Sequence, residues 1–208
     1  MSHNIYNTGI PTDKGSLGYY SLLEWWHNKF SVAEQTYISK KYIPMGGSNL
    51  TSGKIIGSSA SVINFLTGLQ SWFTNLADET ISEKILIKAE SLINKNTPIL
   101  DVHFLYGSII NHYYKKRNID SKFYDLAKKY CKKQIEISVL VKKTFQEESC
   151  YDGLPGHKGY NQLAIILEKE KKYKEAIEIC IEANEMGWNS DWEKRIIRLN
   201  KKLEKEKK

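Results

Sequence analysis

The sequence contains little cysteine, proline or arginine, and each shortage excludes a class of structure. The three cysteines, Cys131, Cys150 and Cys180, are odd in number and widely spaced, and no two of them form a CxxC pair. This pattern argues against a disulfide framework and against a zinc cluster, so we expect reduced thiols and neither a metal nor another cofactor. Four prolines are too few for a linker-rich or disordered chain.

Long apolar runs are also missing. No stretch approaches the roughly 20 apolar residues that a membrane-spanning helix requires. The first 15 residues carry neither the basic region nor the apolar segment of a secretory signal. We therefore expect a cytoplasmic protein without a membrane partner.

The scarcity of arginine bears on nucleic-acid binding. The net charge is +7, from 31 Lys and Arg against 24 Asp and Glu, and phosphate backbones attract clustered positive charge. Only Arg117, Arg195 and Arg198 are arginines, however, so the charge is nearly all lysine, which lacks the planar fork of bidentate phosphate and guanine contacts. Aromatic residues interleave with lysine, but they fall on predicted inward positions. Nucleic acid is therefore a less favoured partner than protein.

Residues 1–57 predict a small helical N-terminal subdomain. Residues 1–15 carry Gly, Pro, Asn and Thr without a period and predict an extended arm. From Leu17 onward, apolar residues recur at spacings of three and four, which predicts a helix of about three turns. Ser31 and Glu34 form a capping-box pattern that predicts the start of a second short helix.

Apolar stripes with a helical period predict helices over most of residues 60–148. The first two form an antiparallel hairpin, and Thr80 with Glu83 predicts the cap of its second helix. A helix over residues 99–116 and a single long helix over residues 122–148 follow. The apolar residues expected to face the core include Val62, Phe65, Leu66, Leu69, Phe73, Leu76, Phe104, Ile109, Tyr113, Cys131 and Val139.

Residues 159–188 carry a more specific pattern. A small residue on a first helix, Ala164, is followed twelve residues later by Ala176 on a second helix. The residues of the pattern are Tyr160, Leu163, Ala164, Leu167, Tyr173, Ala176, Ile177, Cys180 and Ala183. This pattern resembles the tetratricopeptide repeat family, in which two helices pack as a hairpin and alanines fit against the next unit. The resemblance is clear over residues 159–188, divergent over 60–148 and absent from 1–57.

Apolar residues also recur at i, i+4, i+7 and i+11 from Trp192, on a segment otherwise rich in Lys, Arg and Glu. This predicts a helix over residues 190–206, of the kind that caps a stack of repeats. The resemblance then implies an all-α fold. Antiparallel helical hairpins over residues 58–208 would stack as a short tetratricopeptide-like superhelix, closed by the C-terminal capping helix and preceded by the small N-terminal subdomain.

Recognisable catalytic and metal-binding motifs are missing from the chain. The phosphate-binding motif GxxxxGK[ST] fails at two positions around Lys54. His103 and His112 are nine residues apart on one predicted helix, about 180° around its axis, so they cannot hold one ion together. His157 is expected in a solvated turn. Enzymatic activity stays open, with the balance against it.

Residues 43–59, with four glycines, one proline and four serines, predict a loop. Loops of this length without secondary structure are uncommon unless they are functional or disordered. Glycine-rich turns and the helix start near Ser58 suit an anion. The alternative function is therefore a small-ligand or nucleotide-binding regulatory protein. The residues expected to line its pocket are Trp25, Trp26, Gly46, Gly47, Asn49, Lys54 and Trp72.

The leading hypothesis follows from the repeat resemblance. If the repeats stack as in that family, the first helices form a concave face that binds a partner. The residues expected on this face are Ser108, Asn111, His112, Asn161, Ile165 and Glu168. They are mostly polar and suit an extended peptide or a helix of another protein. We therefore expect a non-enzymatic helical-repeat interaction protein with a protein or peptide partner.

Overall fold

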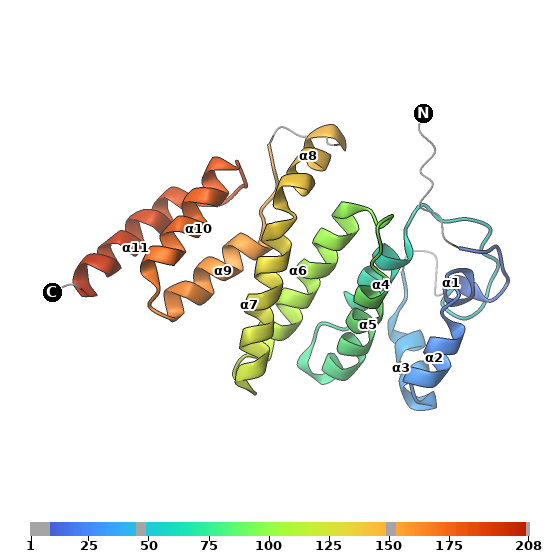
Figure 1. Ribbon diagram of the computed structural model, residues 1–208. Coiled ribbons are helices and arrows are strands. Elements are labelled where there is room, and N and C mark those ends of the chain that lie inside the picture. Colours follow the sequence, from blue (N-terminus) through green and yellow to red (C-terminus); the bar gives the residue numbers. More distant parts are fainter. Residues whose placement is uncertain (1–8, 45–48, 149–152, 207–208) are drawn as a thin grey trace. The chain divides into compact units, whose positions relative to one another are not determined.

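The structure, a computed structural model, describes residues 9–44, 49–148 and 153–206 (Figure 1). Within these residues it consists of eleven α-helices, one short 3₁₀ helix and three isolated β-bridges, without a β-strand. The all-α class predicted from the sequence is confirmed. The chain divides into two compact units, an N-terminal unit up to residue 105 and a C-terminal unit from residue 106, whereas the sequence predicts a boundary after residue 57.

The N-terminal unit begins with a broken helix. Its elements are α1 (Gly15–Tyr19), α2 (Leu23–Lys29), α3 (Val32–Lys41), α4 (Val62–Gln70), η1 (Leu76–Asp78), α5 (Glu79–Ser91) and the first part of α6 (Ile99–Lys115). The single three-turn helix predicted from Leu17 is wrong, because the chain breaks at Ser21, where φ is 57°. Leu17, Tyr20 and Leu22 are all buried. On one straight helix they would point in widely different directions, so the break turns them all toward the core.

α3 is held at both ends. The predicted capping box is confirmed, because Ser31 Oγ accepts from the Glu34 amide while Glu34 Oε2 accepts from the Ser31 amide. The same glutamate also pairs with Lys84 of α5, at 2.6 Å. At the other end, Lys41 pairs with the buried carboxylate of Asp78. These contacts fix α3 against the hairpin that follows it.

The described part of the predicted N-terminal arm pairs with the predicted glycine-rich loop. Thr12 and Ile55 exchange two backbone hydrogen bonds, of 3.0 Å and 2.8 Å. The amide of Gly15 donates to the carbonyl of Gly53 at 3.0 Å. Two segments without regular secondary structure therefore satisfy each other's backbone groups, and they form one edge of the N-terminal unit.

α4 and α5 form the predicted hairpin, with differences in detail. The side-chain amide of Gln70, at the end of α4, donates to Ser82 near the start of α5 at 2.9 Å. η1 runs directly into α5, so Thr80 already lies inside the helix and the predicted cap by Thr80 and Glu83 is wrong. Leu76, expected to face the core, lies in η1 and is 59% exposed.

The C-terminal unit contains one helix break that the apolar pattern conceals. Its elements are the rest of α6, then α7 (Ser121–Glu136), α8 (Ser138–Glu148), α9 (Lys158–Lys169), α10 (Tyr173–Glu185) and α11 (Trp192–Glu206). The single helix predicted over residues 122–148 is wrong, because α7 and α8 are separated at Ile137. The β-branched Ile135, Ile137 and Val139 occupy alternate positions around this break, and such side chains slightly disfavour a helix. Val139 and Phe104, both expected inward, are largely exposed.

The hairpin predicted by the repeat pattern is present as α9 and α10, and the predicted last helix is present as α11. Ala164, Ala176 and Ala183 are fully buried. α9 packs against both α7 and α10, and α10 packs against α11. Gly159 lets α7 approach closely, and its amide donates to the side-chain oxygen of Gln134 at 2.6 Å.

His157 is buried rather than solvated, which corrects the expectation for this residue. It precedes α9, and its Nδ1 accepts from the amide of Tyr160 at 3.4 Å. Its ring centroid lies 4.8 Å from that of Tyr160 and 4.6 Å from that of Trp188. Trp188 follows α10, too far along the chain for a local sequence pattern to reveal the contact.

Candidate functional site

In the C-terminal unit, the second half of α6 and α9 are parallel neighbours. A Cβ placed on Gly107 would lie 3.9 Å from the Cβ of Lys158, at the start of α9. Further along both helices, the ammonium of Lys169 lies 5.4 Å from the ring centroid of Tyr114. Because residue numbers rise together along the two helices, α6 and α9 run in the same direction.

Polar contacts join α9 to α11, and these two helices also run in the same direction. Arg195 donates to the backbone carbonyl of Asn161 at 3.2 Å. Arg198 and Lys202 donate to the two carboxylate oxygens of Glu168, at 2.6 Å and 2.7 Å. Together with Ile165, which is half-buried on the same side of α9, these residues form what we call the α9–α11 face.

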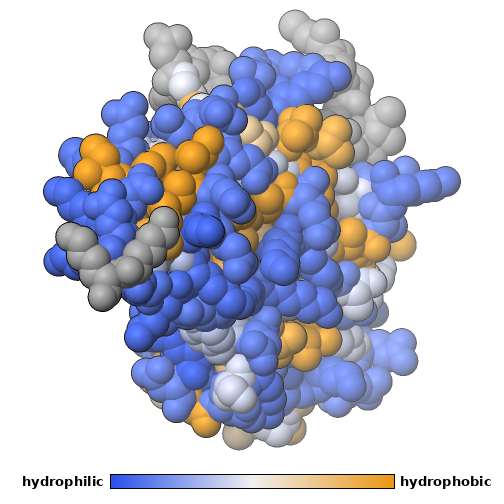
Figure 2. All heavy atoms as spheres, turned by 60° about the vertical axis from the view of Figure 1, so that its left-hand side comes forward, coloured by the Kyte–Doolittle hydropathy of each residue, from blue (hydrophilic) through white to orange (hydrophobic). Residues whose placement is uncertain are grey.

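The α9–α11 face is polar and carries surplus positive charge. Burial raises the pKa of Glu168, but the hydrogen bond from Lys202 and the charge of Arg198 lower it by more, so the carboxylate stays ionised. The face therefore carries one negative charge, on Glu168, and three positive charges, on Arg195, Arg198 and Lys202. The side chain of Arg198 is 55% exposed and that of Lys202 is 45% exposed. The space-filling view that brings this end of the chain forward shows mostly hydrophilic residues and separate hydrophobic patches (Figure 2).

The residues predicted for the partner face are accessible to different degrees. Asn111 on α6 is exposed, and Ser108 is half-buried. His112 is only 8% exposed and offers little surface to a partner. Asn161 also accepts from the hydroxyl of Ser190 at 3.1 Å. The sequence predicts only a capping helix for the segment that contains Arg195, Arg198 and Lys202. The i, i+3 and i+7 spacing of these three cations nevertheless places them on one side of that helix.

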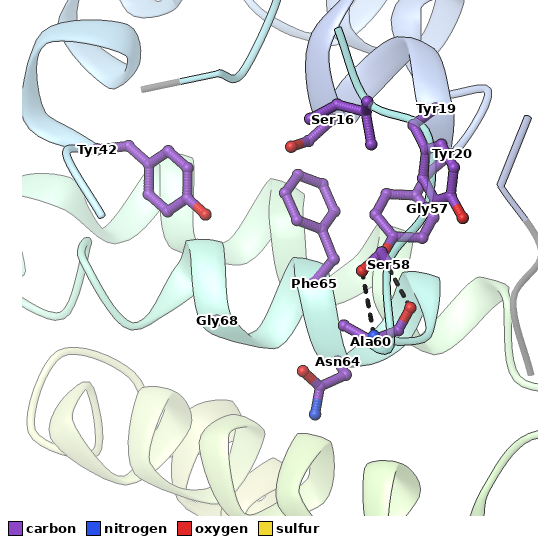
Figure 3. Close-up of a pocket in the computed structure, with 11 residues that line it drawn as sticks. Ser16, Tyr19, Tyr20, Tyr42, Gly57, Ser58, Ala60, Asn64, Phe65 and Gly68 are labelled. Carbon is purple, nitrogen blue, oxygen red and sulfur yellow. Dashed lines mark hydrogen bonds between the residues drawn. The ribbon is translucent and has the colours of Figure 1, made fainter. Parts of the chain in front are cut away.

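The N-terminal unit contains a cleft of about 300 Å³ (Figure 3). It lies between α1, the end of the glycine-rich loop, Tyr42 after α3 and the outer side of α4. The residues that line it are Ser16, Tyr19, Tyr20, Tyr42, Ile55, Gly57, Ser58, Ala60, Asn64, Phe65 and Gly68. The lining includes four aromatic rings but no Asp, Glu, His, Lys or Arg. The cleft therefore suits an uncharged ligand better than an anion.

One wall of the cleft is held together by several contacts. The rings of Tyr20 and Phe65 stack with centroids 4.9 Å apart and an angle of 22° between their planes. The hydroxyl of Tyr20 lies 2.9 Å from Ser58 Oγ and 2.8 Å from the carbonyl of Ala60. Burial raises the pKa of Tyr20, so its hydroxyl stays protonated at neutral pH. These contacts tie α1, the loop end and α4 together at the cleft.

None of the described residues predicted for a ligand pocket lines this cleft. Trp26 is buried and lines a second hollow, of about 450 Å³, together with His27, Gln35, Thr36, Ser39, Lys40 and Thr51. Trp25 packs edge-on against Phe30. Trp72 packs edge-on against Tyr42, a lining residue. Asn49 and Lys54 are exposed and line neither hollow, and Gly46 and Gly47 lie outside the described residues.

The sequence assigned Tyr19 and Phe65 to core stripes, and both of them line the cleft. The glycine-rich loop does contribute to the lining, but through Ile55, Gly57 and Ser58 rather than through its first half. In the sequence, the glycines at positions 57 and 68, which lie on two sides of the cleft, indicate its place better than the tryptophans do.

Comparisons with known proteins add no assignment. No protein-family model, curated protein or solved structure matches this chain. In the part of the chain that the structure describes, no three His, Cys, Asp or Glu residues are grouped so that they could hold a metal ion. None of the described helices is both long enough and apolar enough to cross a membrane. The functional argument therefore depends on the chain's own geometry.

Proposed function

We propose that the chain is a non-enzymatic helical-repeat interaction protein that binds a protein or peptide partner across the α9–α11 face. The observation that carries the proposal is the set of cross-helix contacts in which α11 meets Asn161 and Glu168, two residues predicted to contact a partner. The parallel order of α6, α9 and α11, with α7 and α10 packed as second helices, supports the resemblance to tetratricopeptide repeats.

The chemistry of the face favours a partner segment that carries carboxylates. Glu168 pairs with Arg198 and Lys202, but one carboxylate neutralises only part of their charge. Arg195 uses one of its donors on Asn161 and keeps others for a ligand. Guanidinium groups bind carboxylates through paired hydrogen bonds, and positions fixed in advance reduce the entropy lost on binding. The proposed partner is therefore an extended acidic peptide.

Reversing two charges on α11 tests this proposal. We expect the Arg198→Glu, Lys202→Glu double variant to bind acidic peptides at least about tenfold more weakly, because two exposed attractions become repulsions. The measurement is fluorescence-anisotropy titration of the full chain with peptides that differ only in charge. Neutral and basic forms of the same peptide should bind weakly to the unaltered protein.

A matched control separates the face from net charge. Lys129→Glu, Lys132→Glu makes the same change of charge at two exposed positions on α7, and it should leave acidic-peptide binding nearly unchanged. Equal losses in the two double variants would mean that binding follows net charge alone. That result, or equal affinity for acidic and basic peptides, would reject the α9–α11 face as the binding site.

A further inference from the structure

Within the cleft of the N-terminal unit, the ring of Phe65 lies between those of two tyrosines. Tyr20 stacks against one face of Phe65. In Figure 3, Phe65 stands between the Tyr20 side of the cleft and Tyr42 on the opposite side, with Gly68 below the space that separates Phe65 from Tyr42. The rings of Phe65 and Tyr42 thus border an open slot.

Gly68 keeps the floor of this slot open. It belongs to α4, one turn after Phe65, and a Cβ placed on it would meet no atom within 4 Å. Glycine is an unfavourable residue inside a helix, and here no close packing contact requires it. Gly57, on the loop side of the cleft, is equally open. Both positions have room for a ligand where another residue would place a side chain.

Two hydroxyl groups point into the slot. Those of Ser16 and Tyr42 are both directed toward the space between them (Figure 3). Within the described residues, neither hydroxyl has a hydrogen-bond partner. Burial raises the pKa of Tyr42, so this phenol remains a hydrogen-bond donor at neutral pH. The slot therefore combines aromatic rings with two hydroxyl groups.

We propose that this cleft binds an uncharged, planar heteroaromatic compound, with its ring between Phe65 and Tyr42 and its polar edge toward Ser16. Aromatic side chains can stack on any flat aromatic ring, whatever its substituents, because every such ring presents a π-face. The lining contains no charged residue to pair with an ionic ligand. A volume of about 300 Å³ is at the lower end of small-molecule sites, which fits one base or nucleoside rather than a larger cofactor.

Calorimetric titration of the full chain with adenine, cytosine and uracil, and with their nucleosides, tests the proposal directly. We expect saturable binding of at least one of these compounds with a dissociation constant below about 1 mM. The matching 5′-monophosphate should gain no affinity, because no cation lines the cleft. A non-planar alcohol of similar size, cyclohexylmethanol, should not bind. Failure of all six ring compounds to bind, or tighter binding of the monophosphate, overturns the proposal.

Filling the slot provides the decisive variant. Gly68→Leu places a side chain in the slot without a backbone clash, so the protein should keep or raise its melting temperature and lose ring binding by more than about tenfold. Ser91→Leu, at an exposed position on α5, is the matched control and should bind normally. Undiminished binding to a folded Gly68→Leu protein would overturn the proposal.

The hydroxyl and the ring contribute separately. Tyr42→Phe removes one hydrogen bond and should weaken binding by about two- to tenfold. Phe65→Leu removes the stacking face while keeping an apolar side chain, and it should weaken binding by about tenfold or more. Equal affinity in all three proteins would show that neither group contacts the ring and would overturn this placement of the ligand.

Discussion

The Gly15→Ala variant is expected to lower the free energy of unfolding of the N-terminal unit by about 3 kcal/mol. Gly15 has a φ of +64°, a conformation that alanine adopts only with strain. An added Cβ would also come within 2.7 Å of the Ser52 amide nitrogen and within 2.8 Å of the Leu50 carbonyl carbon, and it would press on the carbonyl of Asn49. These are backbone atoms, so relief requires movement of the whole loop segment.

Urea denaturation followed by tryptophan fluorescence measures this effect. Trp25, Trp26 and Trp72 report on the N-terminal unit, whereas Trp188 and Trp192 report on the C-terminal unit, which should unfold as before. Gly57→Ala is the control, because an added Cβ there meets nothing within 4 Å and its φ needs no glycine. A loss at Gly15 no larger than that at Gly57 would contradict the argument from backbone contact.

Helices whose pattern is local were predictable from the sequence. The alanines of α9 and α10 alternate with larger apolar residues at helical spacing, and the same residues are buried in the hairpin. The capping box at Ser31 was equally local, because both of its partners lie within four residues. In such segments the hydrophobic period and the backbone hydrogen bonds favour the same structure.

Features that depend on distant contacts were not predictable. The break at Ser21 turns neighbouring apolar residues toward one core, which an argument from a single helical stripe misses. His157, at the start of the α9–α10 hairpin, is buried because Trp188, at the far end of the same hairpin, covers its ring. The lining of the cleft combines α1, a loop and α4, and no period in the sequence connects Tyr20 with Ser58 or Phe65.

The two proposed sites belong to different units and differ in chemistry. The α9–α11 face is charged and polar, whereas the cleft is aromatic and uncharged. Their variants therefore serve as controls for each other. Gly68→Leu should leave peptide binding unchanged, and the Arg198→Glu, Lys202→Glu protein should bind ring compounds normally. Loss of both activities in one variant would indicate damage to the fold.

The buried carboxylate of Asp78 makes Lys41→Met the second substitution with a large expected effect. Asp78 is 3% exposed and accepts from Lys41 at 2.5 Å and from the hydroxyl of Tyr37 at 2.7 Å. Removing the ammonium leaves a buried carboxylate with one neutral partner. Because Lys41 itself is partly exposed, we expect a loss of about 2 kcal/mol, below the range for fully buried pairs.

The pH dependence of this loss identifies its cause. Burial raises the pKa of Asp78, but the hydrogen bonds from Lys41 and Tyr37 lower it by more, so its folded value lies below the ordinary 3.8. The ion pair therefore stabilises the fold fully above about pH 4, and this stabilisation is lost as the pH falls through the folded pKa. The difference in unfolding free energy between the original protein and Lys41→Met should shrink as the pH falls through this range.

The double variant Lys41→Met, Asp78→Asn should recover part of the loss, because it buries no unpaired charge. A difference that stays constant down to about pH 2 would show that methionine acts through packing against Tyr37 and Phe73, whose rings Lys41 also covers, and not through the charge.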